Sequence, residues 1–227
     1  FKYNYTAPLP GDEHPFIIGL AAAPSFFGRE STVLRVAIQA ERAPTEEKKP
    51  ANLVFLVDVS GSMLADDKLP LVKRVLVQTL NILDPTDTVS IVTYASGTAV
   101  PLPPTQISKR DIIETTINGL QAGGSTAGAS GIDLAYQQAE AAFIEGGINH
   151  IILCTDGDFN VGPSSTSELV SLIEEKRATG ITLTVLGFGT GNLNDSMMEL
   201  ISNAGNGTYA IIFNETQANR FVEERML

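Results

Sequence analysis

The sequence is poor in the residues that build disulfide frameworks and zinc sites. It contains one cysteine, two histidines and no tryptophan. A single thiol excludes an internal disulfide, and Cys154 lies inside the apolar run from His150 to Thr155, which predicts a buried and inert side chain. With so few thiol and imidazole groups, the usual ligand sets of zinc are disfavoured.

Positive charge is also scarce. The 227 residues include 15 Lys and Arg against 26 Asp and Glu, which gives a formal net charge of −11 at pH 7. Binding to nucleic-acid phosphates needs clustered basic side chains, so this charge balance argues against a nucleic-acid partner. An acidic surface instead raises the local concentration of cations.

Long hydrophobic runs are absent as well. No apolar stretch approaches the roughly 20 residues that cross a bilayer, and Phe16 to Ala23 is too short even with its neighbours. We therefore expect no membrane span in this sequence. A chain of this length can form one large domain, or one domain with an appendage.

Two regions with different patterns divide the chain. In residues 1–51, the run from Phe16 to Ala22 and the alternating Leu34, Val36 and Ile38 predict two short strands, followed by the polar linker APTEEKKP. We expect this N-terminal β appendage to pack against the rest of the chain, with a detached arm as the alternative. Residues 52–227 alternate strand and helix patterns, which predicts an α/β fold with a doubly wound, mostly parallel sheet and helices on both faces.

The expected elements of the second region follow one another at short intervals. Strands are predicted at 54–57, 88–94, 99–102, 150–155, 181–188 and 208–213. Helices are predicted at about 69–83, 108–118, 126–143, 165–179, 193–204 and from 215 onward. We expect Ser108 to cap the second helix and Phe143 to join the buried face of the third. The prolines Pro101, Pro103 and Pro104 should stop the pairing of the edge strand.

The stretch NLVFLVDVSGSM, residues 52–63, combines a buried strand with a loop of oxygen donors. The run from Val54 to Val57 is typical of a strand covered on both faces, which places Asp58 at its carboxyl end, where open α/β sheets bind ligands. Ser60 and Ser62 follow at alternate positions. Three hard oxygen donors suit Mg²⁺, Mn²⁺ or Ca²⁺. A strand-to-helix turn with serine capping is the simpler alternative.

The string DVSGS, residues 58–62, resembles the metal-ion-dependent adhesion site of the von Willebrand factor type A family. That motif continues with a distant Thr and a distant Asp, and Thr126 in GGSTAG and Asp156 in LCTDGD match them in order and context. Together with GGINHIILCTDGDFNVG and TVLGFGTGNLND, these stretches are similar to a bacterial subgroup with a β appendage before the domain. The resemblance implies a divalent cation, Mg²⁺ first and Mn²⁺ or Ca²⁺ as alternatives, held by Asp58, Ser60, Ser62, Thr126 and Asp156.

Residues around these positions have possible supporting roles. Gly123 and Gly124 would let the backbone approach the site closely. Asp158 and Asn160 could line its rim, although such residues more often only form turns. The glycines of GFGTGN do not have the G-x-G-x-x-G spacing of a dinucleotide fingerprint, so we interpret this stretch as a strand-to-helix turn.

The resemblance implies a protein-binding module rather than an enzyme. The direct ligands would be mainly neutral hydroxyls, so the metal keeps positive charge, and an Asp or Glu carboxylate of a protein partner completes its coordination. We expect such an adhesion or scaffold module in the periplasm or cell envelope.

Two alternatives remain open. In the first, the metal only fixes the three loops and the module is structural. In the second, the chain is a Mg²⁺-dependent phosphate-ester hydrolase. The sequence argues against the hydrolase, because Ser60 stands where an aspartyl-phosphate enzyme of that kind wants a second Asp. We also expect no Lys or Arg in the three loops to stabilise a transferring phosphoryl group.

Overall fold

A computed structural model describes residues 8, 14, 16–26, 28, 31–40, 48–125, 129–157, 166–190 and 193–225. The chain divides into two compact units, residues 1–48 and residues 49–227. The first unit contains the expected strands as a two-stranded antiparallel sheet. β1 (Phe16–Pro24) pairs with β2 (Thr32–Ala40) along the full length of both.

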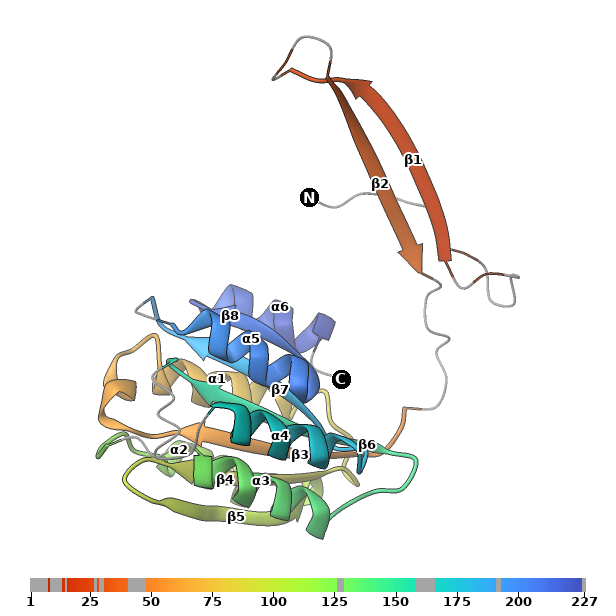
Figure 1. The fold of residues 1–227 in the computed structure, drawn as a ribbon. Helices are drawn as coiled ribbons and strands as arrows, with labels where there is room; N and C mark the ends of the chain where they lie inside the picture. The colour runs from red at the N-terminus through yellow and green to blue at the C-terminus, as the bar shows by residue number, and fades with distance from the viewer. Residues whose placement is uncertain are drawn as a thin grey trace. The chain divides into compact units, whose positions relative to one another are not determined.

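The second unit is built on a six-stranded sheet (Figure 1), which confirms the predicted mostly parallel α/β architecture. Its strand order is β5-β4-β3-β6-β7-β8, and only β5 runs antiparallel to its neighbour. The strands are β3 (Ala51–Asp58), β4 (Thr88–Tyr94), β5 (Thr98–Gln106), β6 (Ile148–Thr155), β7 (Thr182–Phe188) and β8 (Asn206–Ile212).

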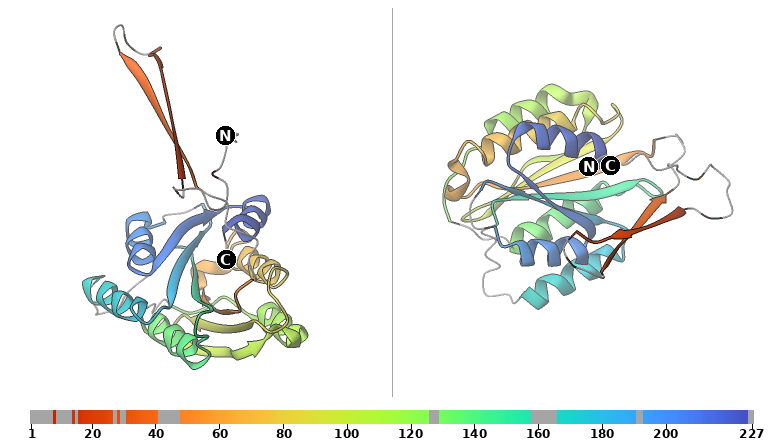
Figure 2. Two further views of the ribbon diagram at one scale, coloured as in Figure 1. Left: turned by 90° about the vertical axis from the view of Figure 1, so that its right-hand side faces the viewer. Right: turned by 90° about the horizontal axis from the view of Figure 1, so that it is seen from above.

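Helices cover both faces of this sheet (Figure 2). One face carries α1 (Leu69–Thr79), α2 (Arg110–Gly119) and α6 (Glu215–Arg225). The other carries α3 (Ala129–Ala141), α4 (Thr166–Arg177) and α5 (Asp195–Ala204). Two short 3₁₀ helices, η1 (Gly61–Leu64) and η2 (Ile107–Lys109), precede α1 and α2.

The central strand β3 shows why its sequence is an unbroken apolar run. Side chains alternate between the two faces of a strand, so Phe55 packs with α1 and α2 while Leu56 packs with α3, α4 and α5. Every residue of β3 is buried. Cys154 on the neighbouring β6 is fully buried as expected, and its burial raises the pKa of the thiol.

The edge strand β5 is longer than the sequence predicts. It continues through Pro101, Pro103 and Pro104, which we expected to end it. Proline lacks the N–H that a sheet ladder uses, but an edge strand has a side without a neighbour where this loss costs nothing. The pairing with β4 also shifts register at two places, consistent with local interruptions of the ladder.

Three details of the helices differ from the prediction. Ser108 lies inside η2 and does not cap α2, whose N-cap residue is Lys109 without a side-chain cap. Phe143 is 43% exposed, because α3 ends at Ala141 and the chain then leaves the helical periodicity. Similarly, α1 ends at Thr79, so the buried Leu80 and Leu83 reach the core from the turn beyond it.

None of the helices in the described part of the chain has the length and apolar character needed to cross a membrane.

Candidate metal site

The candidate site lies where the strand order of the sheet reverses. β3 is followed in sequence by its neighbour β4 on one side, while its neighbour on the other side is the later strand β6. Asp58 is the last residue of β3, and Asp156 comes directly after β6. Both carboxylates therefore stand at the carboxyl edge of the sheet at a topological switch point, where open α/β sheets bind ligands.

Asp58 is a fully buried carboxylate held by neutral donors. Its Oδ1 accepts the backbone N–H of Ser60 at 2.8 Å, and the Thr155 hydroxyl donates to its Oδ2 over a longer 3.4 Å. Burial raises the pKa of Asp58, the hydrogen bonds from Ser60 oppose this, and the nearby charge of Asp156 adds to the rise. The hydroxyl of Tyr94 lies close enough to influence the same carboxyl group.

The two serines of the first loop bring their hydroxyls together. Ser60 Oγ and Ser62 Oγ are 2.9 Å apart. Ser60 is 1% exposed, whereas Ser62 is exposed, so the pair leads from the buried Asp58 to solvent. Met63, fully buried in the core, anchors the 3₁₀ turn that carries Ser62.

Backbone hydrogen bonds fasten the second loop to the first. Gly61 N donates to Gly124 O at 2.9 Å, and Gly123 N donates to Val59 O at 2.8 Å. Gly124 has a φ of +84°, and a Cβ added there would lie 2.5 Å from Ser96 Oγ. The expected close approach of the glycines is therefore present.

Three predicted residues cannot be placed. Thr126, the fourth expected ligand, follows shortly after this fastened segment but lies outside the described residues, as do the rim candidates Asp158 and Asn160.

The third loop supplies Asp156, whose side chain is only 3% exposed. Gly157 follows with a φ of +88°, and a Cβ there would lie 2.7 Å from the Cα of Leu193. Asp156 Oδ2 accepts a hydrogen bond from Lys68 Nζ at 2.8 Å. The same ammonium donates to the backbone carbonyl of Ser62 at 3.0 Å.

Lys68 corrects the expectation that the loops contain no basic residue. It stands at the end of the first loop as the N-cap residue of α1, so a cation does reach the candidate site. No local pattern in the sequence indicates this role, because the contact joins residues 88 positions apart.

The charged side chains described at the site have a net negative charge, which favours binding of a cation. Asp58 and Asp156 supply two negative charges, and Lys68 supplies one positive charge that contacts only the second of them among the interactions described. A buried carboxylate without a cationic partner is costly. Carboxylate and hydroxyl oxygens form the donor set that hard divalent cations prefer. Among the residues that the structure describes, no group of three or more His, Cys, Asp or Glu side chains is placed to hold a metal.

A model of the von Willebrand factor type A domain matches residues 52–224. The chain belongs to this family. Domains of the family commonly mediate metal-dependent protein interactions and are generally binding modules rather than enzymes.

Among the relatives of this type A domain protein is the "Uncharacterized protein YfbK" of Escherichia coli (strain K12). It is 41% identical over 212 residues, which cover 93% of this chain and 37% of that protein. The chain thus spans less than half the length of these curated relatives.

Several solved structures share the fold at low sequence identity. An aerotolerance-related membrane protein from Bacteroides fragilis aligns with a TM-score of 0.64 and 23% identity, covering 77% of this chain and 97% of that one. Manganese-loaded TRAP protein from Plasmodium vivax aligns with a TM-score of 0.61 and 21% identity, covering 77% and 72%. Proximal thread matrix protein 1 from the mussel byssus, with a zinc-occupied MIDAS (metal-ion-dependent adhesion site) motif, aligns with a TM-score of 0.60 and 22% identity. This alignment covers 78% of this chain and 45% of that one.

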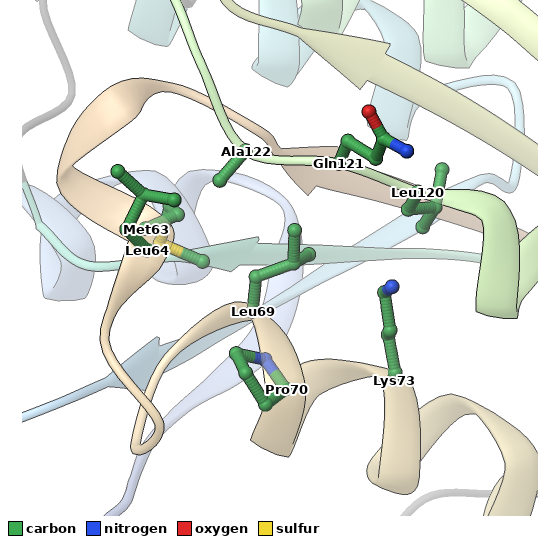
Figure 3. A pocket seen from close by; sticks show the side chains of 8 residues that line it. All are labelled: Met63, Leu64, Leu69, Pro70, Lys73, Leu120, Gln121 and Ala122. Atoms are coloured by element: carbon green, nitrogen blue, oxygen red, sulfur yellow. The ribbon is translucent and has the colours of Figure 1, made fainter.

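A mostly apolar pocket adjoins the first and second loops of this type A domain (Figure 3). Its volume is about 360 Å³. Leu64, which follows the serines, is 68% exposed at its edge, and Leu120 and Gln121 line the opposite side. Ala122 lies closer to Leu64. The remaining lining residues are Met63, Leu69, Pro70 and Lys73.

Proposed function

We propose that this chain is a divalent-cation-dependent protein-binding module. Asp58, Ser60, Ser62, Thr126 and Asp156 would hold the cation, and an Asp or Glu carboxylate of a partner protein would complete its coordination. The observation that carries the proposal is the pair of serine hydroxyls 2.9 Å apart, leading from a buried carboxylate to solvent. Such an arrangement offers oxygen ligands inside and leaves the outer side of the site open.

The choice of ligands favours an anionic partner. Hydroxyls contribute no charge, so a divalent cation held partly by serines keeps net positive charge toward the open side. A partner carboxylate would neutralise it in a partly dry interface, where one such contact can dominate the binding energy. The pocket beside Leu64 would accept an apolar side chain next to that carboxylate.

The metal is proposed to be Mg²⁺, with Mn²⁺ or Ca²⁺ as alternatives. A manganese-loaded relative supports a divalent cation in general. The zinc-occupied MIDAS motif of the mussel byssus protein weakens the argument that few histidines and cysteines exclude zinc. Affinity orders among divalent metals often favour zinc even where geometry favours magnesium.

Of the two arguments against a hydrolase, the absence of a basic residue no longer holds, whereas the position of Ser60 still does. Lys68 places an ammonium beside Asp156, where it could stabilise a phosphoryl group. However, Ser60 still occupies the position of the second Asp, and its Oγ hydrogen-bonds with Ser62. We therefore retain binding as the proposed function, and we place the protein in the periplasm or cell envelope, consistent with a structural relative that is a membrane protein.

The carboxylate hypothesis can be tested with manganese as a probe. Water-proton relaxation should be enhanced when Mn²⁺ binds the protein, and acetate should reduce this enhancement by replacing bound water, whereas the neutral acetamide should not. The Ser62→Ala variant, which changes an exposed position, should bind Mn²⁺ more weakly. Equal effects of acetate and acetamide would contradict the proposal.

Capture of partner proteins distinguishes the proposed binding function from the alternative in which the metal is purely structural. Cell-envelope extract is passed over immobilised protein in Mg²⁺ and in EDTA, with Ser62→Ala as the matched control. We expect capture only by the unmodified chain in Mg²⁺. If EDTA lowers the melting temperature but leaves capture unchanged, the metal only fixes the loops.

A further inference from the structure

Lys68 is fixed in place by the backbone around it. Its N–H donates to Ala65 O at 3.0 Å, and its carbonyl accepts the N–H of Val72 at 2.8 Å as α1 begins. Pro70 stands in the first turn of this helix, where its fixed φ suits the start of a helix. The side chain of Lys68 therefore leaves the main chain from a defined position.

The aliphatic stem of Lys68 lies against the backbone that follows β7. Gly189 has a φ of +89°, and a Cβ added there would be 2.9 Å from Lys68 Cε and 3.2 Å from Lys68 Cγ. A residue other than glycine would thus push the stem away. The absence of a side chain at Gly189 leaves space for the stem, and the ammonium at its end reaches Asp156.

The ammonium joins the two loops that carry candidate ligands. It is 2.8 Å from Asp156 Oδ2 in the third loop and 3.0 Å from the carbonyl oxygen of Ser62 in the first. The side chains of Lys68 and Asp156 are only 19% and 3% exposed, so water screens this pair less than a surface ion pair.

We propose that Lys68 is a built-in competitor of the metal: its ammonium neutralises Asp156 when the site holds no cation, and a divalent cation has to displace it from that carboxylate. This inference rests on the metal site proposed above. A positive charge that already uses one candidate ligand both blocks an oxygen and repels the incoming cation. Lys68 therefore lowers the metal affinity of the site and stabilises the metal-free protein.

The main test compares Lys68→Met with the unmodified chain by calorimetric titration with Mg²⁺ and with Mn²⁺. Methionine keeps an apolar stem over Gly189 but removes the charge. We expect at least about tenfold tighter binding, since a unit charge a few ångströms away changes a binding constant by that order where water screens it incompletely. Lys73→Met is the matched control, because Lys73 lies on the same helix and donates instead to Asn118 O. Its affinity should change by less than about twofold.

A second measurement uses the unmodified chain and does not depend on a variant that folds. Saturation with Mg²⁺ should shift the ¹³Cε resonance of Lys68, as its ammonium leaves Asp156, and should leave that of Lys73 in place.

A third measurement compares the melting temperatures of the two variants in EDTA. Lys68→Met should melt at a lower temperature than Lys73→Met, because it removes the ammonium that pairs with the buried Asp156.

The outcomes separate this inference from the proposed function. If the unmodified chain binds metal and Lys68→Met binds it equally or more weakly, Lys68 does not compete and only the inference falls. If neither protein binds Mg²⁺ or Mn²⁺, the metal site and the inference fall together. If only Lys68→Met binds metal, competition is supported, while metal-dependent partner binding by the unmodified chain is contradicted.

Discussion

Replacing Asp58 by Asn tests whether this carboxylate serves a metal or only the fold. The amide keeps an oxygen that can accept the 2.8 Å hydrogen bond from Ser60 N, and the Thr155 hydroxyl can rotate to accept from the new amide group. The variant therefore removes mainly the negative charge. That charge is fully buried and lies near Asp156, and both effects raise the pKa of Asp58.

Without metal, Asp58→Asn should be the more stable protein. A raised pKa in the folded state means that ionisation of Asp58 opposes folding, so this cost is present at neutral pH and disappears as the pH falls below the ordinary value of 3.8. Relief of the cost of burying this charge, together with the remaining repulsion from the Lys68-paired Asp156, is worth about 1 kcal/mol. For a chain of this size, that corresponds to a rise of roughly 2 to 4 °C in the melting temperature.

With metal, the order should reverse. Binding to the folded state adds about 2.7 kcal/mol at a hundredfold excess over Kd, or roughly 5 to 10 °C, and the variant loses most of this gain. The assay is four melting curves at neutral pH, the unmodified chain and Asp58→Asn, each in EDTA and in excess Mg²⁺. An additional Asp58→Ala variant should be less stable than Asp58→Asn by about 1 to 3 kcal/mol in EDTA, because it leaves the buried Ser60 N–H unpaired.

The reasoning is refuted if Asp58→Asn is several kcal/mol less stable than the unmodified chain in EDTA. Asp58 would then be a structural acceptor whose charge the fold requires. It is also refuted if Mg²⁺ raises the melting temperature of both proteins equally, since the cation would then bind elsewhere.

Three further predictions concern other parts of the domain. Burial lowers the pKa of His150 to about 4 from 6.5, so the chain should lose stability as the pH falls from 6.5 to 4. Because the residue as a whole is only half-buried, solvent screening reduces the expected loss to about 2 kcal/mol. Urea unfolding at several pH values should show this slope, and a His150→Gln variant with the same slope would contradict it. Gly124→Ala should lower the free energy of unfolding by about 1 to 3 kcal/mol and weaken Mg²⁺ binding, since the residue has a positive φ and its Cβ would clash with Ser96. Gly123→Ala should cost much less stability, because an added Cβ there meets nothing within 4 Å. Equal losses of stability in chemical denaturation would count against this account of the second loop. Incubation with Mg²⁺ and a generic phosphate ester should give no turnover, and turnover that Asp58→Asn abolishes would replace the binding function by a hydrolase.

The sheet and its helices could be predicted because their sequence signals are local. β4 begins and ends at the predicted residues, since Thr88 to Tyr94 is a compact β-branched run between turns. The alternation of such runs with helical periodicities was enough to predict a parallel sheet covered on both faces. The errors lie where local rules meet tertiary context: prolines are tolerated in β5 because it is an edge, and Phe143 is exposed because α3 ends two residues before it.

The candidate site was predictable in its outline for a topological reason. Asp58 and Asp156 each follow an apolar run, and parallel strands present their carboxyl ends at one edge of a sheet. The structure brings both carboxylates and the two serines to that edge. Their role as metal ligands stays a prediction, as does the place of Thr126.

The contribution of Lys68 could not be predicted, because it depends on a segment with no apparent link to the motif. In the sequence, GFGTGN is only a glycine-rich turn between β7 and α5, and that interpretation is compatible with the structure of its described part. Its Gly189, however, leaves space for the Lys68 stem, and the stem can therefore reach Asp156. Gly189 and Asp156 are 33 positions apart in the sequence. The charge balance of the site therefore depends on a fourth segment, which contains none of the expected ligands. A substitution at Gly189 should change metal affinity through Lys68 alone, so its effect should vanish when Lys68 is already methionine.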